Sequence, residues 1–170
     1  MPRPTSVCVL SLAAVLGLHG QGRREFPPTL VPATITVMGI NGTTATFSFS
    51  DLSKLPQKTV KTTDHGTPVT FEGVLLTDML AKVDLPVGEK FQKTGASYYL
   101  VVEALDGYKA VFAWAELDST FMDKSVYVVT SRDGKPISGN DGPFLLVVPG
   151  EKRSARWVRQ VTALKIHQAN

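Results

Sequence analysis

Cysteine is almost absent from this chain of 170 residues, and its one cysteine, Cys8, lies in an apolar stretch near the N-terminus. The stretch runs from Val7 to Leu18 and follows Arg3. Its length of about a dozen residues is short for a membrane span and typical of the apolar region of a signal peptide. We therefore predict a signal peptide over residues 1–22, and the alternative interpretation is an N-terminal membrane anchor.

Removal of the signal peptide leaves a mature chain without cysteine, so disulfides and thiolate ligands to a metal are excluded. We expect such a protein to be periplasmic or secreted, with no membrane span once the leader is removed. Its stability has to come from a hydrophobic core, which about 150 residues can supply as one domain. Residues 23–33 begin with polar residues and are rich in proline, which indicates a linker, and residues 34–168 then form the domain.

A strong excess of one charge is also lacking, since 18 Lys and Arg face 15 Asp and Glu for a net charge of +3. So small an excess in an exported protein argues against a nucleic-acid partner. The charges are nevertheless unevenly distributed. Residues 25–131 hold 8 basic and 12 acidic side chains, a net of −4, whereas residues 132–170 hold 7 and 3, a net of +4. The C-terminal part can therefore attract a small anionic ligand, and ordinary surface solvation is the alternative.

Long helical patterns are scarce, whereas short strand patterns are frequent. Strands are predicted at 34–38, 44–49, 59–63, 69–72, 98–104, 109–114, 125–130, 144–148 and 161–167. Asn41-Gly42 and Asp106-Gly107 are typical of hairpin turns. Apolar residues at helical spacing occur over residues 75–83, and a short helical turn is predicted over 51–55 with Ser50 as its cap. This mixture of elements predicts an α+β or mostly β domain, and we take α+β as the fold class.

Glycine and proline gather between Asp133 and Gly150, a density typical of ordered loops around one buried strand. A run of basic residues follows directly. The residues that we predict to face an anion are Lys135, Lys152, Arg153 and Arg156. Arginine side chains beside a glycine-rich turn suit a phosphate or another oxyanion. The alternative is a solvated loop that places Trp157 in the core.

Histidine is scarce as well, because His65 and His167 are the only two that follow the predicted signal peptide. No side chains flank them at metal-ligand spacing, so we predict no metal site. The pair Asp64-His65 is better explained by a turn than by a catalytic dyad. The sequence also contains no nucleophile elbow, phosphate loop or dinucleotide motif.

A series of short motifs runs along the chain in a recognisable order. The motifs are Asp51-Leu52, Leu55-Pro56, Phe71-Glu72-Gly73-Val74-Leu75-Leu76, Asp106-Gly107-Tyr108, Asp133-Gly134-Lys135-Pro136, Gly142-Pro143, Val147-Val148-Pro149-Gly150 and Ala155-Arg156-Trp157-Val158. Over residues 34–167 their order and spacing resemble the molybdopterin-binding domain of the sulfite oxidase family. The resemblance implies a shortened version of that compact α+β fold, with molybdopterin as the cofactor. It also implies that, if the protein is an enzyme, it is a molybdopterin-dependent oxidoreductase.

The sequence differs from the pattern of this family at the position of the molybdenum ligand. Active members hold molybdenum through a cysteine that follows the Leu-Pro element, whereas residues 62–66 here contain none. The resemblance places Asp64 and His65 at that position, as candidate cofactor-binding residues together with the basic ones named above. Leu145 stands where the family usually has an arginine, and Arg156 stands where it usually has a lysine that faces the pterin. Thiolate is a soft ligand that suits molybdenum, and neither a carboxylate oxygen nor an imidazole nitrogen reproduces that bond.

Three functions remain compatible with the sequence. The first is an exported binding protein without redox catalysis, which takes an anionic ligand or a pterin through its basic loop. The second is a molybdenum cofactor-dependent oxidoreductase with an unconventional metal ligand. The third is a structural or interaction module that keeps only the fold. The missing cysteine favours the first and third over the second, and the basic loop favours the first over the third.

Overall fold

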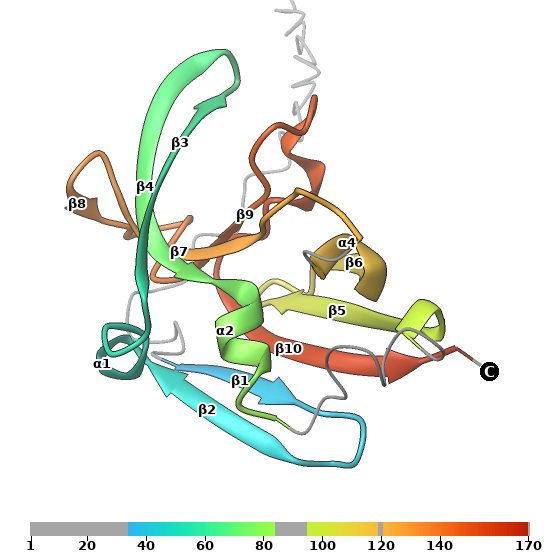
Figure 1. Ribbon diagram of the computed structural model, residues 1–170. Coiled ribbons are helices and arrows are strands. Elements are labelled where there is room, and N and C mark those ends of the chain that lie inside the picture. Colours follow the sequence, from blue (N-terminus) through green and yellow to red (C-terminus); the bar gives the residue numbers. More distant parts are fainter. Residues whose placement is uncertain (1–33, 84–94, 119–120, 170) are drawn as a thin grey trace, which may run out of the picture.

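The computed structural model describes residues 34–83, 95–118 and 121–169 of the chain (Figure 1). Strands make up 47% of this part and helices 15%. The fold is therefore β-rich, and the prediction of an α+β domain is wrong. The patterns interpreted as helical form helices of only four or five residues, which link strands and are too short to make a layer of their own. The predicted signal peptide and linker lie outside the described residues.

The first of two sheets, sheet A, contains the first and the last described strands. Its members are β1 (Thr34–Met38), β2 (Thr44–Ser48), β5 (Tyr98–Ala104), β6 (Lys109–Ala113) and β10 (Val161–Gln168). Their order is β2-β1-β10-β5-β6, with β1 and β10 parallel and the other neighbours antiparallel. The predicted bounds of β1 and β5 are confirmed, because alternation of side chains buries one face of these strands and leaves the other partly exposed.

The second sheet, sheet B, is built on a long hairpin that rises away from sheet A (Figure 1). Its members are β3 (Gln57–Asp64), β4 (Thr67–Leu75), β7 (Tyr127–Arg132) and β8 (Lys135–Pro136), with β9 (Leu145–Val147) also paired to β7. The register between β4 and β7 shifts next to Gly73. A Cβ atom on Gly73 would lie 2.2 Å from the Val128 carbonyl oxygen, so only glycine fits there.

The helices in the described residues are α1 (Phe49–Leu52), α2 (Leu76–Leu80), η2 (Gly95–Ser97), α4 (Trp114–Leu117) and η3 (Ser154–Arg156). The N-cap of α1 is Ser48, and the predicted cap at Ser50 is wrong. Ser48 Oγ accepts a hydrogen bond from the backbone N–H of Asp51, whose carboxylate accepts one from the Ser48 N–H, and this reciprocal pair starts the helix earlier. Among the described helices, none has the length and apolar character that crossing a membrane requires.

Two hydrophobic cores lie on opposite faces of sheet B. The fully buried side chains of the larger core, next to sheet A, include Ile35, Val37, Leu76, Met79, Leu100, Val102, Phe112, Val128, Phe144, Leu146 and Leu164. The smaller core consists of Val60, Val69, Phe71, Val129, Ile137, Leu145 and Val147. Along β9, Leu145 and Val147 therefore face the smaller core while Leu146 faces the larger one. Trp157 packs against both cores and lies at their boundary.

Candidate functional site

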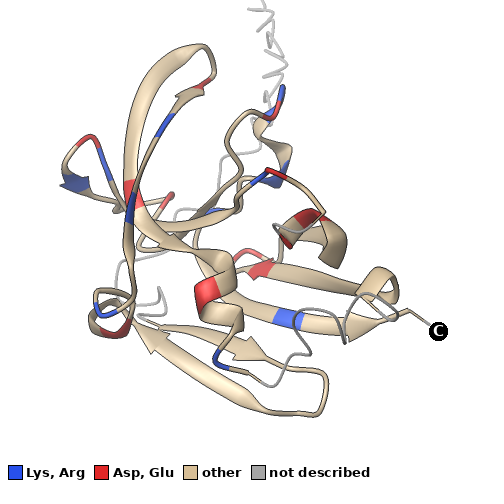
Figure 2. Ribbon diagram, in the orientation of Figure 1, with Lys and Arg blue, Asp and Glu red and all other residues tan. Residues whose placement is uncertain are grey.

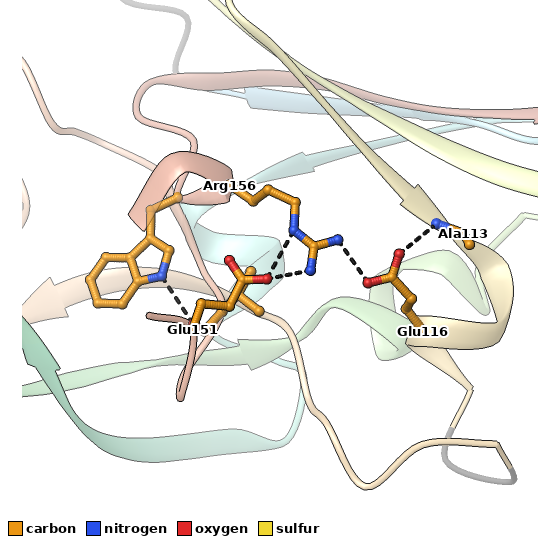
Figure 3. A network of polar contacts seen from close by, with 6 residues as sticks. Ala113, Glu116, Glu151 and Arg156 are labelled. Carbon is orange, nitrogen blue, oxygen red and sulfur yellow. Dashed lines mark hydrogen bonds and ion pairs between the residues drawn. The ribbon is translucent and has the colours of Figure 1, made fainter. Parts of the chain in front are cut away.

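The basic loop, residues 149–157, is held by a polar network around Arg156 (Figure 3). Arg156 Nε donates a hydrogen bond of 2.9 Å to Glu151 Oε1, and Nη2 donates to the same oxygen. Nη1 donates one of 2.7 Å to Glu116 Oε2 in α4. The other Glu116 oxygen accepts from the backbone N–H of Ala113 at 3.1 Å. One arginine thus connects its own loop to the end of β6 and to α4.

The surroundings of Arg156 stabilise its positive charge. Its guanidinium carbon lies 4.6 Å from the centroid of the Phe112 ring, in cation–π geometry. Partial burial on its own lowers the pKa of Arg156, but the hydrogen bonds with Glu151 and Glu116 outweigh this and raise the pKa above its ordinary value. The charge of Arg156 is therefore permanent, and two carboxylates already balance it.

Two further hydrogen bonds fix the same loop. The Tyr108 hydroxyl, just after the turn between β5 and β6, donates to the Ala155 carbonyl oxygen at 2.5 Å. The Trp157 indole N–H donates to the Val148 carbonyl oxygen at 3.0 Å, and its ring meets Phe71 of β4 edge to face, with centroids 5.7 Å apart. Consecutive residues therefore attach the loop to different sheets, Arg156 to sheet A and Trp157 to sheet B.

Lys152 and Arg153 occupy the segment that the Glu151–Arg156 pair closes. Both side chains are exposed, and neither forms an ion pair with another described residue. Of the predicted anion-facing residues, the structure brings these two and Arg156 together in one loop. Lys152 and Arg153 differ from Arg156 because no described carboxylate balances their charges.

Lys135 lies elsewhere. It is an exposed residue of the two-residue strand β8. Figure 2 shows β8 and the basic loop on opposite sides of the β3–β4 hairpin. The structure therefore does not bring Lys135 to the loop that carries Lys152 and Arg153.

Asp64 and His65 lie at the end of the β3–β4 hairpin. His65 and Gly66, with φ angles of 48° and 84°, form the two-residue turn, so the interpretation of His65 as a turn residue is confirmed. The His65 side chain is 81% exposed. Asp64 Oδ2 lies 3.0 Å from Arg132 Nη1. Within the described residues, neither Asp64 nor His65 has a hydrogen bond or ion pair to the basic loop.

This hairpin end does not provide the ligand set that a molybdenum centre of the sulfite oxidase type needs. It has no thiolate, and the carboxylate of Asp64 is paired with Arg132. The described residues contain no group of three or more His, Cys, Asp or Glu side chains that could hold a metal ion. Leu145 is 5% exposed and packs in the smaller core. The residues present therefore fit a molybdenum–thiolate site poorly.

Sequence reasoning missed several residues that shape this end of the molecule. Glu116 and Tyr108 are distant from the basic loop in sequence, and no local pattern reveals their contacts. Gln160 is buried with a φ of 48°, and its side chain donates to the Gly139 carbonyl oxygen at 3.3 Å. Its own carbonyl oxygen accepts from the Leu105 N–H at 3.0 Å, so Gln160 links the glycine-rich loop to the β5–β6 turn.

Comparison with known proteins identifies the fold. No family model and no curated protein sequence matches the chain. Among solved structures, the sulfane dehydrogenase SoxCD from Paracoccus pantotrophus is similar, with a TM-score of 0.59 and 18% sequence identity. The similarity covers 79% of this chain and 38% of that one, so this protein corresponds to well under half of the larger chain. At this identity the comparison shows a shared fold.

Proposed function

We propose that this protein is an exported anion-binding protein without redox catalysis, and that the basic loop, residues 149–157, holds the ligand. The observation that supports this most directly is the state of Lys152 and Arg153. Both are exposed, and neither is paired with a described carboxylate, although the loop that carries them is anchored to two sheets.

The ligand that suits this loop is an oxyanion, either free phosphate or sulfate or the phosphate group of a larger molecule such as a pterin. Arginine offers a planar fork of donors to two oxygens, and lysine adds a compact charge. Because the loop is already fixed, little conformational entropy is lost when the ligand binds.

The absence of redox catalysis rests on the donor set. A molybdenum centre needs a soft ligand, and Asp64 and His65 supply only oxygen and nitrogen. We expect protein produced in a host that makes the molybdenum cofactor to contain no stoichiometric molybdenum. Elemental analysis of that protein is the measurement, and a full complement of molybdenum would restore the oxidoreductase alternative.

Export is the third part of the proposal, and the short apolar stretch from Val7 to Leu18 supports it. N-terminal sequencing of protein from the periplasm or the medium should find a chain that starts near residues 20–22. A mature protein that still begins at Met1 would contradict it.

Anion binding is tested by thermal unfolding at fixed ionic strength. Phosphate or sulfate should raise the Tm of the wild-type protein, because a ligand that binds only the folded state stabilises it. Lys152→Ala/Arg153→Ala should lose this rise. The control Lys58→Ala/Lys61→Ala removes two positive charges from exposed positions on β3, and phosphate or sulfate should still raise the Tm of this variant. A wild-type Tm that no anion raises would leave the protein as a scaffold or interaction module.

A further inference from the structure

We infer that Arg156 is a positioning residue, which orders the basic loop so that Lys152 and Arg153 meet the anion, and that Arg156 itself does not contact the anion. The inference rests on the proposed function and assigns separate roles to the residues of the proposed anion site. Arg156, Glu116 and Glu151 together are called the clasp below.

Each of the three side-chain nitrogens of Arg156 already donates a hydrogen bond to a carboxylate. Its Nε and Nη2 both donate to Glu151, and Nη1 donates to Glu116. The guanidinium carbon also lies over the Phe112 ring, 4.6 Å from its centroid. An anion that bound the Nε–Nη2 fork of Arg156 with two oxygens would have to displace the Glu151 carboxylate that is already hydrogen-bonded there.

The net charge of the clasp also disfavours direct contact. One positive and two negative side chains, Arg156 against Glu116 and Glu151, sum to −1. An anion that approaches the guanidinium group therefore meets a net negative charge at close range. Lys152 and Arg153 remain the positive charges of the loop that no described carboxylate balances.

The same contacts explain how the clasp gives the loop its shape. The Glu151–Arg156 pair closes the four residues between them into a short loop, of which Lys152 and Arg153 are the charged members. Glu116 then fixes this loop to α4, since its second oxygen accepts from the Ala113 N–H. Without the clasp, the Tyr108–Ala155 hydrogen bond and Trp157 would still hold the C-terminal part of the loop, and Lys152 and Arg153 would lose their fixed placement.

Glu116→Gln separates the positioning role from direct binding. The substitution makes the protein more positive, so electrostatics alone predicts tighter anion binding. Loss of the clasp predicts the opposite, a phosphate Kd raised by about tenfold, the scale of one lost charged hydrogen bond. Calorimetric titration with phosphate and with sulfate at fixed ionic strength measures this. The control Glu72→Gln removes a carboxylate that accepts from Ser131 on sheet B, and it should not weaken binding. Tighter binding by Glu116→Gln would show that Arg156 is freed to bind the anion itself and would overturn the inference.

Arg156→Lys supplies a second readout, because it keeps the charge and loses the fork. We expect faster amide hydrogen exchange in the basic loop, unchanged exchange in β10, and weakened anion binding. Two results would overturn the inference and leave the proposed function intact. One is unchanged amide hydrogen exchange in the basic loop of Arg156→Lys. The other is an anion affinity equal to that of the wild-type protein in both Glu116→Gln and Arg156→Lys. A wild-type protein that binds neither anion overturns the proposed function and the inference together.

Discussion

The Arg156 triad and the Glu103 triad, both among the described residues, have central charges of opposite sign, and their surroundings differ. In the first, Arg156 lies between the carboxylates of Glu116 and Glu151. In the second, Glu103 of β5 lies between Lys109, at 2.8 Å, and Lys165, at 2.7 Å. Each has a central charge with two partners of the other sign, and neither central side chain is fully buried.

The difference lies in what each triad connects. Lys109 and Lys165 belong to β6 and β10, the two strands already hydrogen-bonded to β5, and Lys109 stands directly opposite Glu103. The Glu103 triad therefore adds charge pairs to strands that the backbone already joins. Arg156 instead connects an irregular loop to α4, 40 residues away in sequence. The same count of charges thus reinforces a sheet in one place and determines a loop conformation in the other.

The largest expected effect is that of Arg156→Ala. It leaves Glu151, whose side chain is 13% exposed, without its partner, and it removes the cation over Phe112. We expect a loss of about 2 kcal/mol in the free energy of unfolding, between the values typical of surface and of buried ion pairs. Lys165→Ala should cost less than about 1 kcal/mol, because the backbone of the sheet remains. Urea denaturation of both variants measures the difference, and equal losses would remove the distinction between the triads.

A smaller effect is expected for Tyr108→Phe, which removes the hydroxyl that donates to the Ala155 carbonyl oxygen and leaves the ring. Since the Tyr108 side chain is partly exposed, a water molecule can donate a hydrogen bond to the Ala155 carbonyl oxygen instead. The loss in unfolding free energy should therefore be about 1 kcal/mol or less. Hydrogen exchange should locate the change in the basic loop. A change confined to the β5–β6 turn would show that this hydrogen bond does not help to anchor the loop.

Strands and turns in this fold could be predicted from local sequence, because alternation and turn residues act over a few positions. The bounds of β1 and β5 and the turn at His65 illustrate this. The α+β class was predicted wrongly, because helical spacing at residues 75–83 does not reveal that the helix ends at Leu80 and leaves the fold β-rich.

The candidate site was predictable only in part. The basic residues could be found from the local sequence, but their partners could not. The net charge of +4 over residues 132–170 correctly marks Lys152, Arg153 and Arg156 as a basic run. It gives no sign that Glu116, from the acidic part of the chain, balances one of them. Pairing across the fold depends on tertiary contacts, which no count of charges along the sequence contains.

The smallest effect concerns Glu103 and pH. Hydrogen bonds from Lys109 and then Lys165 hold the pKa of Glu103 below its ordinary value of 4.5. A carboxyl group whose pKa is lowered by folding stabilises the protein above its unfolded pKa, and this contribution is lost as the pH falls through the folded pKa. Glu103→Gln should therefore lower the free energy of unfolding at pH 7 by about 0.5 kcal/mol. The difference from the wild-type protein should shrink below about pH 4.

Urea denaturation of the wild-type and Glu103→Gln proteins over a series of pH values measures this difference. The Lys109→Ala background serves as the control, because removal of that partner should reduce the effect of Glu103→Gln. Arg156 should behave differently, since its pKa is raised and its side chain stays charged throughout this pH range. If Glu103→Gln lowers the free energy of unfolding as much at low pH as at pH 7, the loss is due to packing and not to charge. The Glu103 triad would then stabilise the protein by a different interaction from the Arg156 triad.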